Sequence, residues 1–224
     1  MFCGKHLLKN LICESCLNTT IFVYNPFCIV CQKESIAGQT HLQCYKKYYP
    51  NKLIVPFVYS GITKLCIINS KFKSRAFSLL SDLTKYCLIY KEQFDLHLVN
   101  KSFLITFVPS DSVRYKKRGF TSSQIIASTL AKELNCSCKC ILKKSKIIEP
   151  FEHKNRLQRF KSIKNGFTFC GKSIPQNVLL VDDVITTGAT LLEASKTLKK
   201  AGVKNVWCFA LCFKPFSNIY YTNA

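Results

Sequence analysis

The chain has 224 residues and a formal net charge of +21 at pH 7, because 33 lysines and arginines stand against 12 aspartates and glutamates. Such a charge favours an anionic partner, and we expect nucleic acid; a lysine-rich composition spread over a solvated surface is the alternative. Fourteen cysteines would suit a secreted disulfide scaffold, but the chain length, the 48% hydrophobic fraction and the lack of a signal peptide argue against that class. No apolar run approaches the roughly 18 residues of a membrane span. We therefore expect a reduced, soluble, cytoplasmic protein.

The first 48 residues are rich in pairs of metal-ligating side chains separated by two residues. Such spacing lets a tight turn direct both side chains at one tetrahedral zinc ion. Eight ligands would form two closed sites of three thiolates and one imidazole each, and closed sulfur-rich sites are structural. Neighbouring pairs should act together, because shorter loops cost less entropy to close. A single site, or free buried cysteines, are the other interpretations. The first site would be Cys3, His6, Cys13 and Cys16, and the second Cys28, Cys31, His41 and Cys44.

The rest of the chain alternates predicted strands with predicted helices. This alternation predicts an α/β fold with a mostly parallel sheet flanked by helices. Cys136, Cys138 and Cys140 occupy alternate positions, which favours a half-buried strand over a third metal site. The main predicted strands are 53–59, 103–108, 178–181 and 206–211, and the predicted helices are 62–72, 76–88, 121–134, 154–163 and 191–201.

A basic loop follows the predicted strand 103–108. Small and polar residues at its start can turn the backbone toward a ligand, and the four cations that follow suit pyrophosphate or nucleic-acid phosphates. Its two aromatic rings can stack on a base. A solvated loop without a ligand is the alternative. For the basic helix that carries Arg159, the alternative is likewise a solvated face. We expect pyrophosphate contacts from Pro109, Ser110, Arg114 and Lys117, and nucleic-acid contacts from Arg114, Tyr115, Lys116, Lys117, Arg118 and Phe120.

Residues 178–190, VLLVDDVITTGAT, carry the strongest signal for chemistry. Asp182 and Asp183 stand where the predicted strand would end, at the edge where open α/β sheets bind ligands. The next residues offer hydroxyls and backbone N–H groups ahead of a helix, whose positive end favours a phosphate. Carboxylates beside a phosphate need another partner, such as ribose hydroxyls with Mg²⁺. The pattern is not a Walker loop, and it predicts a sugar-phosphate site. The loop comprises Thr186, Thr187, Gly188, Ala189 and Thr190.

This segment resembles the signature of the type I phosphoribosyltransferases, which bind 5-phosphoribosyl-1-pyrophosphate (phosphoribosyl diphosphate). The resemblance implies that Asp182 and Asp183 are the catalytic pair that holds the ribose 2- and 3-hydroxyls. It also implies that the 186–190 loop holds the 5-phosphate and that Mg²⁺ accompanies the donor.

Taken together, the cysteine pairs, the Arg118-Gly119-Phe120 sequence and the 178–193 stretch resemble the ComF family of phosphoribosyltransferase-like competence proteins. The likeness covers nearly the whole chain. It implies a zinc finger over residues 1–48, a phosphoribosyltransferase-like domain over 49–224, and the handling of single-stranded DNA during natural transformation with other competence proteins. An active phosphoribosyltransferase that acts on a base or amine is the alternative function.

Overall fold

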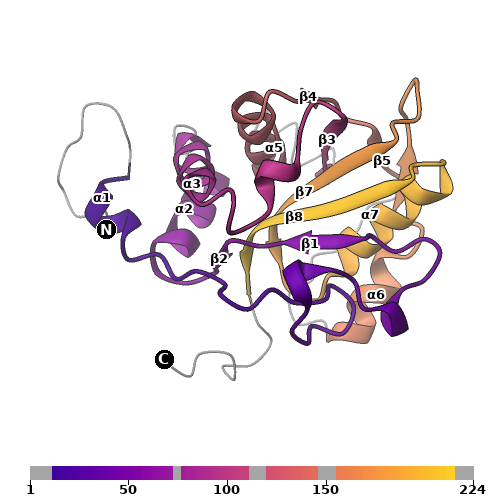
Figure 1. The fold of residues 1–224 in the computed structure, drawn as a ribbon, viewed down its shortest axis with the longest axis horizontal. Coiled ribbons are helices and arrows are strands. Elements are labelled where there is room, and N and C mark those ends of the chain that lie inside the picture. Colours follow the sequence, from indigo (N-terminus) through magenta and orange to yellow (C-terminus); the bar gives the residue numbers. More distant parts are fainter. Residues whose placement is uncertain (1–11, 73–76, 111–119, 146–154, 215–224) are drawn as a thin grey trace.

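The computed structural model describes residues 12–72, 77–110, 120–145 and 155–214 (Figure 1). Its centre is a parallel sheet in the order β1-β8-β7-β3-β4, and β2 also pairs with β8. A separate antiparallel pair is formed by β5 and β6. The strands are β1 Lys52–Ile54, β2 Phe57–Val58, β3 Phe103–Phe107, β4 Ser137–Cys138, β5 Leu142–Lys144, β6 Phe167–Phe169, β7 Asn177–Ile185 and β8 Asn205–Phe213.

The predicted helices are present in the structure, and their ends differ from the predicted ends by a few residues at most. Helix α5 begins after Thr121, whose hydroxyl caps the helix by accepting a hydrogen bond from the Gln124 N–H. Of the three alternating cysteines, only Cys138 lies in a strand, the two-residue β4. The helices are α1 Glu14–Leu17, α2 Gly61–Phe72, α3 Phe77–Ile89, α5 Ser122–Glu133, α6 Arg156–Ile163 and α7 Ala189–Lys200, with the 3₁₀ turns η1 Ile36–Gly38, η2 Leu42–Cys44 and η3 Leu96–Leu98.

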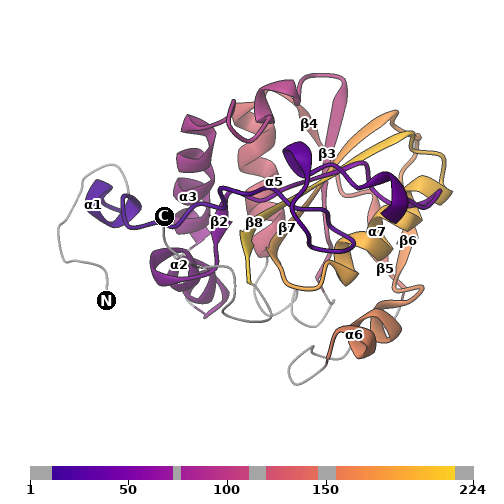
Figure 2. The ribbon, with the colours of Figure 1, turned by 60° about the horizontal axis from the view of Figure 1, so that its bottom comes forward.

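Strand β7 is buried on both faces, as its continuous apolar run predicts. Leu179 and Val181 face a core built with α2, α3 and α5. Val178 and Leu180 face a second core, which contains the apolar side of α7 and residues from β5 and β6. The sheet is therefore the middle of three layers, with α2, α3 and α5 on one face and α7 on the other (Figure 2). The predicted phosphate loop lies at the start of α7.

The cysteine-rich segment packs on the same face of the sheet as α7. Phe27 and Ile29 belong to the core that also contains Leu191 and Leu198 of α7. The segment therefore shares a core with the rest of the chain, and the domain boundary at residues 48 and 49 stays a prediction. Helix α1 lies elsewhere, at the end of the molecule beyond α2 and α3 (Figures 1 and 2).

In the part of the chain that the structure describes, no helix is long and apolar enough to cross a membrane.

The core between the sheet and the α2–α3 layer should dominate stability. Phe209 in β8 is fully buried there. Replacing Phe209 by Ala should lower the free energy of unfolding by about 3–5 kcal/mol, because apolar contacts are lost and a cavity remains. Ile89→Ala, at a position 71% exposed at the end of α3, is the control and should change little. Urea unfolding of both variants tests this, and equal losses would contradict the packing.

Candidate functional site

The acidic pair lies at the part of β7 where one of its two neighbouring strands, β3, has already ended. Strand β3 stops opposite Val181, whereas β8 continues to pair with β7 as far as Ile185. The sequence suggested that the strand would end at Val181, but its ladder to β8 extends it through both aspartates. Asp182 and Asp183 therefore lie beyond the end of β3, at the carboxyl edge where open α/β sheets bind ligands.

The two carboxylates leave β7 on opposite faces, since consecutive strand residues alternate. Asp182 lies on the α7 face, where its charge adds to the burial that raises the pKa of the Cys208 thiol to about 12. Asp183 lies on the other face, where burial, above all, and this carboxylate raise the pKa of Cys212. Of the two, Asp182 lines the pocket that the phosphate loop forms.

The phosphate loop links β7 to α7 and presents unpaired donors. Gly188 precedes the helix in the left-handed region, with φ of 77°. The backbone N–H groups of Thr187, Gly188 and Thr190 donate to no acceptor among the described residues, and Ala189 N–H reaches only the Thr187 hydroxyl, at 3.4 Å. Unpaired N–H groups at the positive end of a helix make a suitable anion site.

Arg159 brings a cation to this loop. It lies on α6, which begins with a capping box formed by Asn155 and Gln158. The Arg159 Nη1 group donates to the Thr186 hydroxyl oxygen at 2.8 Å. The sequence left Arg159 undecided between a solvated face and a binding role, because nothing in its spacing shows that α6 lies beside the loop.

The predicted pyrophosphate and DNA loop is described only at its two ends. The Ser110 hydroxyl oxygen is buried and has no hydrogen-bond partner in the described part of the chain, so a polar ligand would satisfy it. Phe120 packs edge to face against Phe77, which is 45% exposed, with ring centroids 5.5 Å apart. Pro109 lies in the described part of the chain, whereas Arg114, Tyr115, Lys116, Lys117 and Arg118 lie outside it.

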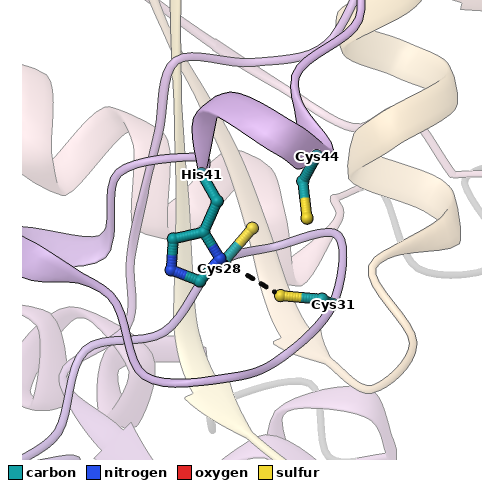
Figure 3. A group of neighbouring side chains, drawn as sticks. All are labelled: Cys28, Cys31, His41 and Cys44. Atoms are coloured by element: carbon teal, nitrogen blue, oxygen red, sulfur yellow. Dashed lines mark hydrogen bonds between the residues drawn. The ribbon is translucent and has the colours of Figure 1, made fainter.

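Four predicted metal ligands meet beside η2 (Figure 3). The ligand atoms of Cys28, Cys31, His41 and Cys44 all lie within 4.8 Å of one another. The separation expected on a tetrahedral zinc ion is roughly 3.8 Å, which follows from zinc–sulfur bonds of about 2.3 Å. The predicted second group of ligands is therefore confirmed as a spatial cluster.

Hydrogen bonds orient the histidine of this cluster for metal binding. The His41 Nε2–H group donates to the Glu34 carbonyl oxygen at 2.9 Å, which leaves Nδ1 as the ligand atom. Nδ1 lies 3.3 Å from the Cys31 sulfur. The second nitrogen is thus held by the backbone, as is usual for metal-bound histidine.

The thiols of the cluster also fit a bound dication. Burial opposes ionisation of Cys28, but hydrogen bonds from the Cys31, His41 and Val30 backbone lower its pKa. Desolvation, a hydrogen bond with Cys31 and the charges of Cys28 and Cys31 raise the pKa of Cys44 to about 11. A zinc ion would offset this repulsion among thiolates. Three sulfurs and one nitrogen form a closed, structural donor set.

The other predicted zinc site is described in part. Cys13 is the residue before α1, and its sulfur lies 3.1 Å from the Ser15 hydroxyl, while Cys16 packs against the α2–α3 core. Cys3 and His6 lie outside the described residues. The cluster at Cys28 is the one metal-binding group of three or more His, Cys, Asp or Glu residues found in the described ranges.

Comparisons with known proteins agree with this geometry. Residues 121–218 match the family model "Phosphoribosyl transferase domain". Competence protein F of Haemophilus influenzae is 28% identical over 213 residues, which cover 92% of each chain. Competence protein ComFC of Streptococcus pneumoniae is 31% identical over 111 residues, 50% of this chain and 48% of that protein. DNA utilization protein YhgH of Salmonella typhimurium is 27% identical over 175 residues, 76% of each.

The α/β fold, the loop ahead of α7 and the matched family model define a domain of the phosphoribosyltransferase type. With the Cys/His cluster that packs against this domain and the relatives named above, the chain resembles the ComF family of competence proteins.

Removal of one ligand tests the metal cluster. Cys31→Ser should lower the zinc content by one ion per chain, because a serine hydroxyl does not replace a thiolate in a closed site. Cys140→Ser, at an exposed cysteine outside the cluster, should leave the zinc content unchanged. Metal analysis of both purified variants measures this, and full zinc content in Cys31→Ser would refute the site.

Proposed function

We propose that this protein handles single-stranded DNA during natural transformation, through a phosphoribosyltransferase-like site that binds phosphoribosyl diphosphate or DNA phosphates. The observation that carries the proposal is the loop of unpaired N–H groups ahead of α7, beside Asp182 and Arg159. The names of the relatives, two competence proteins and a DNA utilization protein, support the biological context.

The chemistry of the loop suits the 5-phosphate of a ribose. Its backbone donors and the hydroxyls of Thr186, Thr187 and Thr190 would contact phosphate oxygens. Asp182 and Asp183, in the roles that the family resemblance implies, would accept hydrogen bonds from the ribose hydroxyls. The buried Ser110 hydroxyl lies at the end of β3, where the pyrophosphate of the donor would bind together with Pro109, Arg114 and Lys117. Bound Mg²⁺ would neutralise part of the diphosphate charge.

The nucleic-acid proposal draws on charge and on aromatic side chains. A net charge of +21 exceeds what a small phosphate ligand requires. Phe77, which is exposed, and Phe120, which is half-buried and follows the basic loop in sequence, offer rings on which bases can stack. We assign the nucleic-acid contacts to Arg114, Tyr115, Lys116, Lys117, Arg118 and Phe120.

Metal content and location belong to the same proposal. Two structural zinc ions would use all eight predicted ligands, one set being the cluster at Cys28. Thiolate ligands persist in a reducing compartment, so a cytoplasmic location fits this chemistry.

The acidic pair favours a second candidate function, an active phosphoribosyltransferase. A carboxylate beside a phosphate loop is unfavourable for DNA phosphates but suits ribose hydroxyls. In a transfer reaction the pair would hold the ribose while the bond from C1 to pyrophosphate breaks and C1 gains positive charge. Release of pyrophosphate in the presence of bases or amines would favour this candidate.

A double variant tests the role of the acidic pair. Asp182→Asn with Asp183→Asn should abolish phosphoribosyl diphosphate binding, because the ribose hydroxyls lose charged acceptors. Loss of two negative charges should by itself strengthen anion binding, so the two effects have opposite signs. Glu92→Gln with Glu133→Gln changes the net charge equally at two exposed positions and is the control. Calorimetric titration of both double variants with phosphoribosyl diphosphate and Mg²⁺ measures their affinities. Unchanged affinity in the Asp182→Asn, Asp183→Asn variant would refute the assigned role of the acidic pair.

Salt dependence tests the DNA surface. Affinity for single-stranded DNA should fall with a log–log slope of roughly −0.7 per phosphate contact. Neutralising Lys116, Lys117 and Arg118 should weaken binding and flatten the slope, whereas Phe120→Ala should cost about 1–3 kcal/mol per base contact with little change in slope.

The control for the charge variant neutralises Lys85, Lys132 and Lys139, which are exposed lysines elsewhere on the molecule. Fluorescence anisotropy at several salt concentrations provides both the affinity and the slope. Binding that is weak and insensitive to salt would contradict the DNA proposal and favour the transferase.

A further inference from the structure

The turn of the metal cluster lies directly against the phosphate loop. Gln32 follows the ligand Cys31, and its Nε2 group donates to the Thr186 carbonyl oxygen at 2.5 Å. A Cβ atom added to Gly188 would lie 3.0 Å from the Ile29 carbonyl oxygen. Residues more than 150 positions apart in sequence thus meet where the metal site and the anion site adjoin.

Helix α6 completes the contact from the other side. Arg156 donates to the Gln32 side-chain oxygen at 3.4 Å and also to the Val30 carbonyl oxygen. Arg159, one turn further along, donates to the Thr186 hydroxyl oxygen. Thr186 is therefore held twice, at its carbonyl through Gln32 and at its hydroxyl through Arg159.

The backbone at Gln32 is unusual for a glutamine. Its φ is 60°, in the left-handed region that favours glycine or asparagine. The turn itself is closed by backbone hydrogen bonds, from Gln32 N–H to the Cys28 oxygen and from Cys28 N–H to the Lys33 oxygen. These bonds need no side chain at position 32, so the turn alone gives no reason for a glutamine there.

The hydrogen bond from Gln32 has a consequence for the loop donors. In a trans peptide the C=O and the following N–H point in opposite directions. When Gln32 holds the Thr186 carbonyl toward the metal turn, the Thr187 N–H is directed away from that turn. Arg159 occupies an acceptor site of the Thr186 hydroxyl, which leaves the O–H proton for a ligand oxygen.

We propose that Gln32 is a positioning residue of the phosphate loop and that, through it, metal binding at the Cys28 cluster is linked to anion binding. This inference rests on the proposed function for the identity of the anion. Cys28 and Cys31 stand on the turn that carries Gln32, so a bound zinc ion would order this turn, and loss of zinc would release the Thr186 carbonyl and lower anion affinity. Linkage is reciprocal, so bound anion would strengthen zinc retention by the same factor.

The decisive variant is Gln32→Gly, because it separates the two roles of this position. Glycine suits the left-handed backbone, so the metal turn should keep its zinc. The side-chain hydrogen bond is lost, and affinity for phosphoribosyl diphosphate with Mg²⁺ should fall roughly threefold to tenfold, as expected for one hydrogen bond. Ala37→Gly is the matched control, since Ala37 also has a positive φ, of 51°, in the same segment. It should bind the probe as the wild type does.

Two further readouts accompany the titration. A chromophoric chelator should withdraw zinc from the wild type less readily when the probe is present, and this protection should shrink in Gln32→Gly. The backbone amides of Leu192 and Lys214, which donate to the Gly188 and Ile185 carbonyl oxygens beside the loop, should exchange hydrogen faster in Gln32→Gly than in Ala37→Gly with no ligand added. The exchange experiment needs no anion, so it stays decisive even if the wild type binds no phosphoribosyl diphosphate and the proposed function fails.

The outcomes separate the explanations. Equal probe affinity and equal amide exchange in Gln32→Gly and Ala37→Gly would overturn the positioning role. Gln32→Asn, which tolerates the same backbone but is too short to reach Thr186, should repeat the effect of the glycine. Loss of zinc from both Gln32→Gly and Gln32→Asn would show that Gln32 serves the metal site itself and would also overturn the proposal.

Discussion

The close approach of two backbones at Gly188 is the constraint on which the rest of the site depends. A Cβ atom at Gly188 would lie only 3.0 Å from the Ile29 carbonyl oxygen, and Gly188 has a positive φ directly before α7. Both facts favour glycine. The turn of the Cys28 cluster therefore packs directly against the phosphate loop.

The sheet supplies the second requirement, a recess at its carboxyl edge. β8 pairs with β7 up to Ile185, whereas β3 ends opposite Val181. The last part of β7 has one neighbour and carries Asp182 and Asp183 beyond the core. Buried residues on both faces of β7 hold this extension in place, so the acidic pair and the loop have a rigid origin. A site built on strand and helix ends in this way positions ligands more accurately than one built on loops alone.

Much of this arrangement could be predicted from the sequence because local patterns determine it. The apolar run before Asp182, the Thr-rich loop and the Cys-x-x-Cys spacing each reflect chemistry within a few residues. The sequence did not reveal that β7 continues to Ile185, because that length depends on pairing with β8. Nor did it reveal Gln32 or the place of Arg159, since both act through contacts between segments distant in sequence. The positive φ of Gln32 is likewise visible only in the structure.

The most direct test of this account is a titration of zinc-loaded, ¹⁵N-labelled protein with phosphoribosyl diphosphate and Mg²⁺, followed by amide NMR. We predict that the largest chemical-shift changes occur at the backbone amides of residues 186–190 and at the side-chain amide of Gln32. Shift changes that are confined to other surfaces, with these amides unaffected, would contradict the claim that the phosphate loop binds the anion and that Gln32 of the metal segment positions this loop.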